Sequence, residues 1–597
     1  MNKHSDRPPF RTRIAILGLC LPAVSTSWML AQDRLDQDSL SLVLPESSQL
    51  VAATHNLSTI YTDIERSIAV EQLRNPIWQS IIQAQVNASQ ASLLNPQPWF
   101  GLDWTDMKSI TNPAAIAVFR DSDGNYSHLF LVQLGANAQQ HPLVQQWITH
   151  RGGLNKLTKT SVGSANFFST TDSKTAEHAV AALGSQWTCF STSTKAIDQW
   201  LKTKPDTTKP SKFDLAANDP LPNSLDGSCR FWLAPWELVQ GYAQSKEPKL
   251  LQSALRFGLD GLGVFQATLH APSKSDAAWR WNYSQIVKTP LEKGMAILNY
   301  GTGPAQPIPK VFPAEMDLLS QSYIDIKPWF QGVSHAIDQV IDEDTPGNFA
   351  DLLDSILTDP EGPKVDIRKE LIYRIGPRMS YGSKTVSNET KTIAETPRSA
   401  TYKRNRVWCC ELQDATVAVS VLDRLFASDD EVKSERIGDF HCWSTKDSQS
   451  LFIAVSAPER QSICIAAIDG SSLYLANDAD WLKTLLRESG SKPKANSPEL
   501  ATYLATTTAD VSIQQAIDLR SWLKRSWLRL PEPSGKGLAS GDMVALLITK
   551  LLLPNTTSNQ LPRFEQIEPG LGVLVHKAIR TGGEIHGEIR LEAHPQK

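Results

Sequence analysis

Several groups of residues in this sequence are of types that could do chemistry, but none completes a catalytic motif. Ser491 and Lys494 have the Ser-x-x-Lys spacing of penicillin-recognising enzymes, yet the companion motifs of that class are missing. No Gly-x-Ser-x-Gly run is present to expose a nucleophilic serine. His576 and His586 lack the His-Glu-x-x-His spacing that places two imidazoles on one helix face. The missing motifs therefore favour a protein that is not an enzyme.

Acidic residues form two further clusters. Asp342, Glu343 and Asp344 are adjacent, whereas a glycosidase requires two acids that converge from separate elements. Residues 121–125 resemble the start of a calcium-binding loop, but their glycine comes fourth instead of sixth, and Val132 occupies the position of the bidentate acid. A solvated turn and a hairpin turn explain these runs. We therefore predict no metal site and no cofactor.

The number of cysteines allows disulfide bonds but does not determine which cysteines pair. An even number of cysteines follows the first 31 residues, and in an oxidising compartment they could pair in several ways. Their spacing never gives C-x-x-C, so it does not favour a zinc site. These cysteines are Cys189, Cys229, Cys409, Cys410, Cys442 and Cys464.

Net charge and the N-terminus restrict partners and location. Lys and Arg total 59 against 63 Asp and Glu, and the net charge of −4 argues against a nucleic-acid partner. Arg7, Arg11 and Arg13 precede an apolar run at 14–24 and then small residues, the order of a secretory signal. We predict a signal peptide at 1–31, an exported chain that is periplasmic or associated with the cell envelope, and no membrane span in the mature chain.

The periodicity of apolar residues mixes helix and strand. Runs at 114–120 and 126–134, separated by a polar turn, predict a β-hairpin, and runs at 263–270 and 278–286 predict a second strand pair. A strand at 229–233 precedes a helix that begins at Pro235. Segments 58–74 and 77–94 have helical periodicity. This order favours an α+β fold, with helices gathered on one side of antiparallel sheet.

Two stretches of the chain match in order and spacing. Residues 167–172 correspond to 442–447, and Gly261-Leu262-Gly263-Val264 recurs as Gly570-Leu571-Gly572-Val573 before a strand pair. We predict two tandem copies of an antiparallel-sheet-plus-helices unit. Their predicted limits are 40–300 and 311–597, joined by a Gly/Pro-rich linker at 301–310.

Residues 359–371 resemble a segment of an uncharacterised family of large exported proteins of planctomycete bacteria. As in that family, a Trp-containing helical stretch (329–340) and an acidic helix (349–357) precede the segment, and Leu44-Pro45 stands near the start of the chain. The resemblance implies a bacterial envelope location. It supplies no activity and transfers no functional residue.

The same segment contains the residues that we single out as a recognition turn, Asp359, Glu361, Asp366 and Arg368. A structural interpretation stands beside this one. Asp359 before a proline would end one helix, and Asp366 could cap a helix at 367–373.

The leading functional hypothesis is a non-enzymatic envelope protein that binds or assembles with a protein or glycan partner. Its basis is the missing catalytic motifs together with the duplication, since two related units create a surface without needing a nucleophile. The alternative is a hydrolase of envelope polysaccharide or peptide, with acids at the junction of the two copies. A third hypothesis is a structural or spacer role.

Overall fold

The computed structural model describes the chain between residues 44 and 592, with interruptions, and its contacts divide the chain into two compact units. The first comprises Met1–Ser48 with Asn95–Asn223, and the second comprises Gln49–Leu94 with Ser224–Lys597. The predicted signal segment and the predicted helix at 77–94 lie outside the described residues. The described residues are 44–59 except 46, 62, 102, 107, 109–120, 124, 126–162, 165–170, 180–183, 186–191, 193, 196–197, 229–246, 248–272, 278–305, 307–341, 347–387, 402–427, 429–445, 452–454, 461–491, 499–504, 510–529, 564–568 and 571–592.

The first unit contains an antiparallel sheet in the order β2-β3-β7-β6-β5-β4. Its strands are β2 (Ala114–Arg120), β3 (Tyr126–Gln133), β4 (Leu157–Val162), β5 (Ala165–Thr170), β6 (Val180–Leu183) and β7 (Trp187–Ser191), and its helix is α8 (Pro142–His150). Strands β2 and β3 form the predicted hairpin, in which Arg120 pairs with Tyr126. Trp147 of α8 packs in the core with its ring centroid 6.0 Å from that of Phe190.

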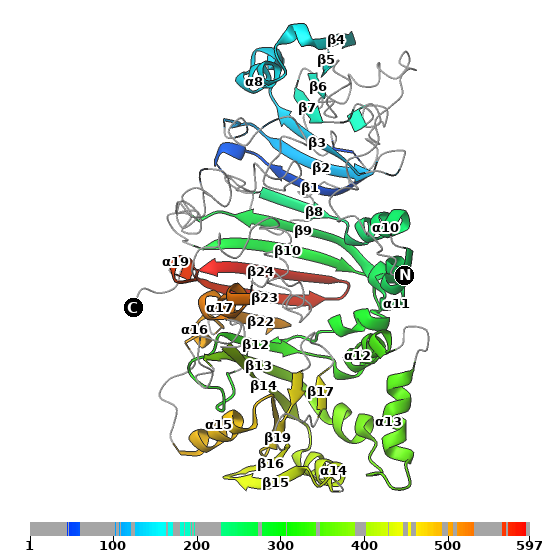
Figure 1. Ribbon diagram of the computed structural model, residues 1–597, viewed down its shortest axis with the longest axis vertical. Coiled ribbons are helices and arrows are strands. Elements are labelled where there is room, and N and C mark those ends of the chain that lie inside the picture. Colours follow the sequence, from blue (N-terminus) through cyan, green and yellow to red (C-terminus); the bar gives the residue numbers. More distant parts are fainter. Residues whose placement is uncertain are drawn as a thin grey trace, which may run out of the picture. The chain divides into compact units, whose positions relative to one another are not determined.

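The second unit contains a longer antiparallel sheet, in the order β1-β8-β9-β10-β24-β23-β22-β12-β13-β14-β20-β19-β16-β15 (Figure 1). The predicted strand pair at 263–270 and 278–286 is confirmed as β9 and β10. The strands are β1 (Ser48–Thr54), β8 (Cys229–Leu233), β9 (Leu262–His270), β10 (Trp279–Val287), β12 (Leu318–Tyr323), β13 (Ile375–Ser387), β14 (Tyr402–Leu412), β15 (Val432–Ile437), β16 (Phe440–Thr445), β19 (Ile465–Ile468), β20 (Ser472–Ala476), β22 (Ile513–Asp518), β23 (Val573–Thr581) and β24 (Glu584–Glu592).

The described strands repeat one order of pairing. The series β2-β3-β7-β6-β5-β4 of the first unit has a counterpart in β13-β14-β20-β19-β16-β15 of the second unit. Likewise, β1-β8-β9-β10 has a counterpart in β12-β22-β23-β24. The last strands of the two series, β10 and β24, pair with each other along most of their length. Within the predicted linker at 301–310, β11 (Gly303–Pro304) pairs with β21 (Asp510–Val511).

Helices cover both faces of the second sheet around β14, β19 and β20, so the prediction that they gather on one side was wrong. Adjacent residues of a strand point to opposite faces, and Cys409 belongs to one buried cluster while Cys410 belongs to another. Leu482 of α15 packs in the first cluster and Leu422 of α14 in the second. Because β14, β19 and β20 are apolar on both faces, both faces must be covered. The fold class α+β is confirmed.

The helices of the second unit are mostly short and follow strands. Its described α-helices are α10 (Pro235–Lys246), α11 (Pro248–Phe257), α12 (Ile326–Ile341), α13 (Asn348–Thr358), α14 (Ala415–Phe426), α15 (Ala479–Ser491), α16 (Ala501–Leu504), α17 (Leu519–Arg529) and α19 (Phe564–Ile567). The predicted helix beginning at Pro235 is α10. Among the described helices, none combines the length and apolarity needed to cross a bilayer.

The six cysteines after residue 31 all keep their thiols, although their number allows disulfides. Cys409 and Cys410 are neighbours on β14 and therefore face away from each other. Burial raises the pKa of the Cys410 thiol to about 12 and that of Cys442 to about 11. These thiols are packing residues in the described core.

Candidate functional site

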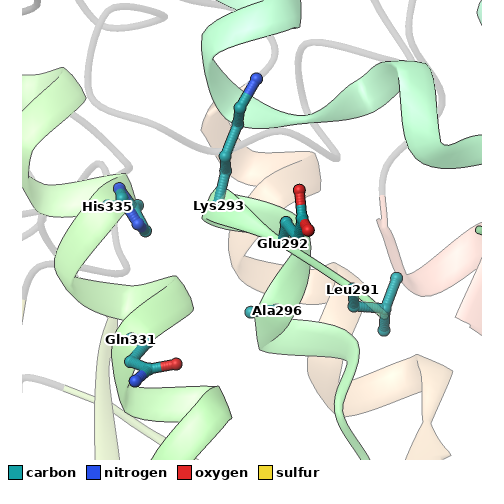
Figure 2. A pocket seen from close by; sticks show the side chains of 6 residues that line it. All are labelled: Leu291, Glu292, Lys293, Ala296, Gln331 and His335. Carbon is teal, nitrogen blue, oxygen red and sulfur yellow. The ribbon is translucent and has the colours of Figure 1, made fainter. Parts of the chain in front are cut away.

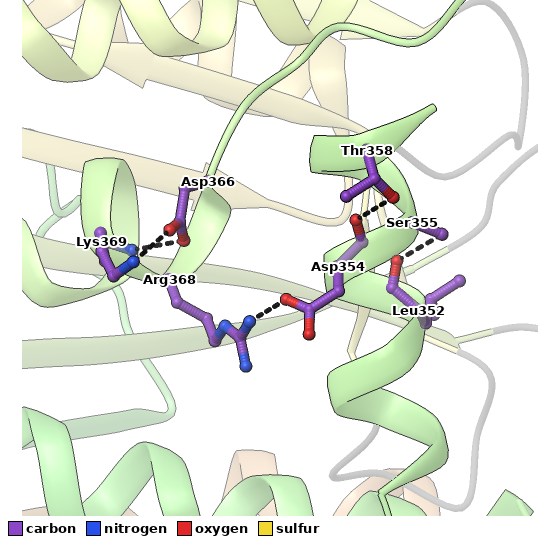
Figure 3. Close-up of polar contacts among 7 residues, drawn as sticks. All are labelled: Leu352, Asp354, Ser355, Thr358, Asp366, Arg368 and Lys369. Carbon is purple, nitrogen blue, oxygen red and sulfur yellow. Dashed lines mark hydrogen bonds and ion pairs between the residues drawn. The ribbon is translucent and has the colours of Figure 1, made fainter. Parts of the chain in front are cut away.

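The predicted recognition turn lies between α13 and β13 (Figure 3). Asp359 follows the last residue of α13, and its Oδ1 accepts the N–H of Glu361 at 3.0 Å. Asp366 accepts the N–H of Lys369 at 3.0 Å and forms an ion pair with its Nζ at 3.1 Å. Asp366 is therefore the predicted cap. The element that it caps is one π-helical turn, η5 (Ile367–Leu371), followed by a 3-10 turn, instead of a continuous α-helix.

Charged side chains of this turn form ion pairs with the neighbouring helices. Arg368 forms an ion pair with Asp354 of α13 (Figure 3). Glu370 forms one with Arg424 of α14. The hydrogen bond from the N–H of Asp366, together with Arg424, holds the pKa of Glu370 below its ordinary value. Slight burial alone would raise the pKa of Asp366, but the bonds from Lys369 outweigh this and lower it. The turn thus connects α13 and α14, which is a structural role.

A groove of about 510 Å³ lies where η4 (Lys293–Leu298), the segment after β10, meets α12 (Figure 2). The two walls approach closely because α12 has a glycine there: a Cβ on Gly332 would lie 2.4 Å from the backbone nitrogen of Ile297. Lys293 has a positive φ of 53°, and its Nζ donates to the carbonyl oxygen of Leu255 at the end of α11. The groove is lined by Leu291, Glu292, Lys293, Ala296, Gln331 and His335.

The groove does not supply the acids that the hydrolase hypothesis requires. Glu292 is the one carboxylate among its described lining residues, and glycoside hydrolysis requires two on opposite sides of the bond. His335 and Gln331 come from α12 one turn apart (Figure 2) and offer hydrogen bonds to a polar guest. In the described ranges, no three His, Cys, Asp or Glu side chains gather as metal ligands.

A serine, a glutamate and a histidine meet where β10 pairs with β24. Ser284 donates its hydroxyl to Oε1 of Glu584, and Nε2 of His586 lies 3.3 Å from Oε2 of the same carboxylate. In a catalytic triad the imidazole lies between the serine and the acid, so that it can take the serine proton. Here the carboxylate lies in the middle. This order leaves Ser284 without the base that would activate it.

The same strands carry a line of side chains that crosses the sheet. Cross-strand partners share a face, and the registers of six successive strand pairs connect one residue on each of seven strands. We name this set the transverse row. It consists of Trp281 (β10), Ile589 (β24), His576 (β23), Gln515 (β22), Ser320 (β12), Tyr381 (β13) and Trp408 (β14).

The two faces of the sheet differ along this row. Every residue of the transverse row is partly buried, and for the residues on β23, β22, β12 and β14 a chain neighbour on the opposite face is buried in one hydrophobic cluster. Those buried neighbours are Val575, Ala516, Leu319 and Val407. Over these four strands one face is therefore core, and the other presents partly buried aromatic and uncharged polar groups.

One contact beside the row connects strands that are not neighbours. Tyr283 of β10 reaches over β24 and shares a hydrogen bond of 2.8 Å with Nε2 of His576 on β23. Gly587 of β24 leaves room for the ring, since a Cβ there would lie 2.4 Å from it. Phe265 stacks on the other side of Tyr283, with ring centroids 5.7 Å apart.

Burial sets the protonation of this contact. It lowers the pKa of His576 and so favours the neutral imidazole. It also raises the pKa of Tyr283 to about 12, so the phenol stays protonated. The pair is therefore uncharged at neutral pH, and the transverse row has no formal charge.

Sequence reasoning missed the transverse row, because no local pattern reveals which residues of seven strands share a register. The predicted turn residues lie elsewhere, between α13 and β13, and none belongs to the row.

Comparisons with protein-family models, with curated proteins and with solved structures find no match to the chain. The resemblance of residues 359–371 to a planctomycete family therefore stays a prediction.

Proposed function

We propose that this chain is an exported bacterial envelope protein that binds or assembles with a protein or glycan partner and does not catalyse a reaction. The observation that carries the proposal is the transverse row, in which seven partly buried, uncharged side chains share one face of the sheet, and the opposite face is core over β23, β22, β12 and β14. Export and envelope location rest on the order of basic, apolar and small residues at 1–31.

A partner on this face must be recognised by side chains. Each strand of the row is hydrogen-bonded to a neighbour on both sides, so its backbone groups are already used. Trp and Tyr are enriched in binding interfaces, because they bury a large area with few rotatable bonds. Trp281, Tyr381 and Trp408 offer such groups at the two ends of the row.

We further propose that the chain arose by tandem duplication. Two observations support this: the repeated order of strand pairing, and the recurrence of Gly-Leu-Gly-Val before β9 and β23. In the proposed duplicate, β10 and β24 are equivalent last strands. Their antiparallel pairing is the isologous contact expected of two identical subunits, now within one chain.

The partner hypothesis is tested by affinity capture from the envelope of the source organism. The natural mature chain should retain a partner that Trp408→Ala loses, because that substitution removes an aromatic end of the row. Trp329→Ala is the matched control, since Trp329 is also half-exposed but lies on α12. Retention of every partner by Trp408→Ala would contradict the proposal.

Export is tested separately by mass spectrometry of the chain recovered from the periplasm of a Gram-negative host. We expect the recovered mass to lack the segment near 1–31. Recovery of the whole chain from the cytoplasm alone would contradict export.

A further inference from the structure

We propose that β15, the edge strand of the second sheet, is an interface at which two copies of this chain pair antiparallel, centred on Ser434. The partner is a second copy of the chain, and the surface is a sheet edge outside the transverse row, so the inference goes beyond the proposed function. The contact is symmetric, because the same strand of each copy contributes to it.

The outer edge of β15 is open among the described residues. β15 pairs residue for residue with β16 on one side and with no described strand on the other, and Figure 1 shows it as the outermost labelled strand at one end of this sheet. Lys433, Ser434 and Arg436 are exposed. In an antiparallel pair, alternate residues turn their N–H and C=O groups away from the neighbouring strand. β15 therefore offers backbone groups to a further strand.

The charges on this edge are complementary to themselves. Lys433 and Glu435 are two residues apart, so their side chains share one face of the strand. When two copies of β15 pair antiparallel about Ser434, each Lys433 lies opposite Glu435 of the other copy. Directly opposed charges of opposite sign stabilise a strand pair, and the symmetry supplies two such pairs.

The carboxylate of Glu435 is held in place for this contact. Its Oε1 forms an ion pair with Lys483 of α15 at 2.7 Å, and that bond holds the pKa of Glu435 below its ordinary value. Oε2 lies 3.9 Å from Nζ of Lys433, which is beyond hydrogen-bond distance. The Lys433 side chain is 65% exposed, so it can turn toward the other copy without losing a hydrogen bond to Glu435.

The same charges select the register. A contact centred on Lys433 instead of Ser434 sets that lysine against its own copy, and a contact centred on Glu435 sets two carboxylates against each other. Like charges that meet directly destabilise a strand pair. Of these three registers, which all keep the same faces together, only the one centred on Ser434 is therefore favourable.

The equivalent strand of the first unit lacks this pattern. β4 is the last strand of the matching series, and it carries an exposed Lys159 but no acidic residue. A lysine without an acid protects an edge, because association would bring charges of the same sign together. Glu435 is thus the residue that makes the edge of β15 self-complementary.

Sedimentation velocity of the purified full chain tests the inference. Because an edge strand of six residues buries little surface, we expect a dimer that forms at high protein concentration and dissociates on dilution or in concentrated salt. A chain that stays monomeric over about a hundredfold range of concentration would overturn the inference.

Two charge reversals test the register. Lys433→Glu and Glu435→Lys each turn both attractive pairs into repulsive ones, and each should weaken self-association about tenfold or more. An equimolar mixture of the two variants should associate as the natural chain does, since each finds the opposite charges in the other. Circular dichroism checks that both are folded. Natural self-association by Lys433→Glu alone would overturn the inference, and so would a mixture of folded variants that stays monomeric.

Two further variants are controls. Arg436→Glu changes the net charge as Lys433→Glu does, but Arg436 lies on the opposite face of β15 and would meet Val432 of the other copy. Lys159→Glu makes the same charge change on β4. Both should self-associate as the natural chain does. Loss of association in Arg436→Glu would make net charge the cause, and loss in Lys159→Glu would assign the contact to β4; either result would overturn the inference.

The proposed function and this inference fail in different ways. If a partner is captured through Trp408 and the chain stays monomeric, the self-association is wrong and the binding function stands. If the chain pairs through Lys433 and Glu435 but Trp408→Ala retains every partner, the binding function is wrong and the inference stands.

Discussion

The hydroxyl of Tyr283 and Nε2 of His576 are 2.8 Å apart, although 293 residues separate them in the chain and one strand lies between them in the sheet. Their rings are nearly parallel, with an interplanar angle of 25°. The contact joins β10 to β23 across Gly587 of β24, where a side chain would occupy the space of the Tyr283 ring.

Gly587→Ala should therefore destabilise the protein by about 1–3 kcal/mol, because the new Cβ displaces the ring and overpacks the face. Tyr283→Phe keeps the ring and removes the hydroxyl, so it should cost about 1 kcal/mol. Gly470→Ala is the control, since nothing lies within 4 Å of its Cβ position. Urea unfolding measures all three, and equal midpoints for Gly587→Ala and Gly470→Ala would contradict the packing.

Substitutions in the predicted recognition turn can distinguish a structural role from a role in binding a partner. Asp366→Ala removes the cap and the ion pair with Lys369, and it should lower the free energy of unfolding by about 0.5–2 kcal/mol. Glu361→Ala should change it little, because the Glu361 side chain is exposed and its N–H, which bonds to Asp359, remains.

Capture from the envelope supplies the second measurement for these variants. We expect both to retain the natural partner, since the turn serves to connect α13 and α14. Loss of the partner by Glu361→Ala, with stability unchanged, would instead favour the recognition role.

Buried histidines should make stability depend on pH. Burial lowers the pKa of His128 on β3 to about 4 and also lowers that of His576. In the unfolded chain histidine titrates near 6.5, so unfolding takes up protons below that pH. The stabilisation is complete above about pH 6.5 and is lost as the pH falls toward 4, at up to ~1.4 kcal/mol per pH unit for each proton.

Unfolding free energies measured across this pH window test the histidine prediction. His128→Gln should show a shallower decline than the natural chain. Substitution of the exposed His150 of α8 serves as the control and should leave the slope as it is. A slope that His128→Gln leaves unchanged would show that other groups cause the decline.

Buried thiols should be inert in the folded protein. Cys189 and Cys410 lie in the cores, and burial raises the pKa of both thiols, to about 12 for Cys410. Because the thiolate is the reactive form, Ellman's reagent should leave both unmodified at neutral pH until urea is added. Peptide mapping identifies the modified residues, and rapid labelling of either cysteine in the native chain would contradict their burial.

Local features of this fold could be read from the sequence, and distant ones could not. The hairpin of β2 and β3 follows from a Gly-containing turn between two apolar runs, and the cap at Asp366 follows from its position after a proline turn. The bonds from this turn to Asp354 and Arg424 span 14 and 54 residues, and no periodicity reports them.

The candidate site was harder to predict than the fold. Its seven residues belong to seven strands, and a shift of one residue in any register would move a side chain to the opposite face. The neighbours of His576 on β22 and β24 depend on pairings that only the folded chain fixes. The helices on both faces were missed because short apolar runs such as 465–468 do not reveal which face needs cover.

Because β10 and β24 pair within one chain, the central sheet does not dissociate when the protein is diluted. If these strands belonged to separate subunits, dilution would pull them apart. Within one chain, the two strands stay covalently joined, so their pairing does not depend on the protein concentration. A row of side chains that depends on both strands therefore stays assembled even where very few molecules of the protein are present.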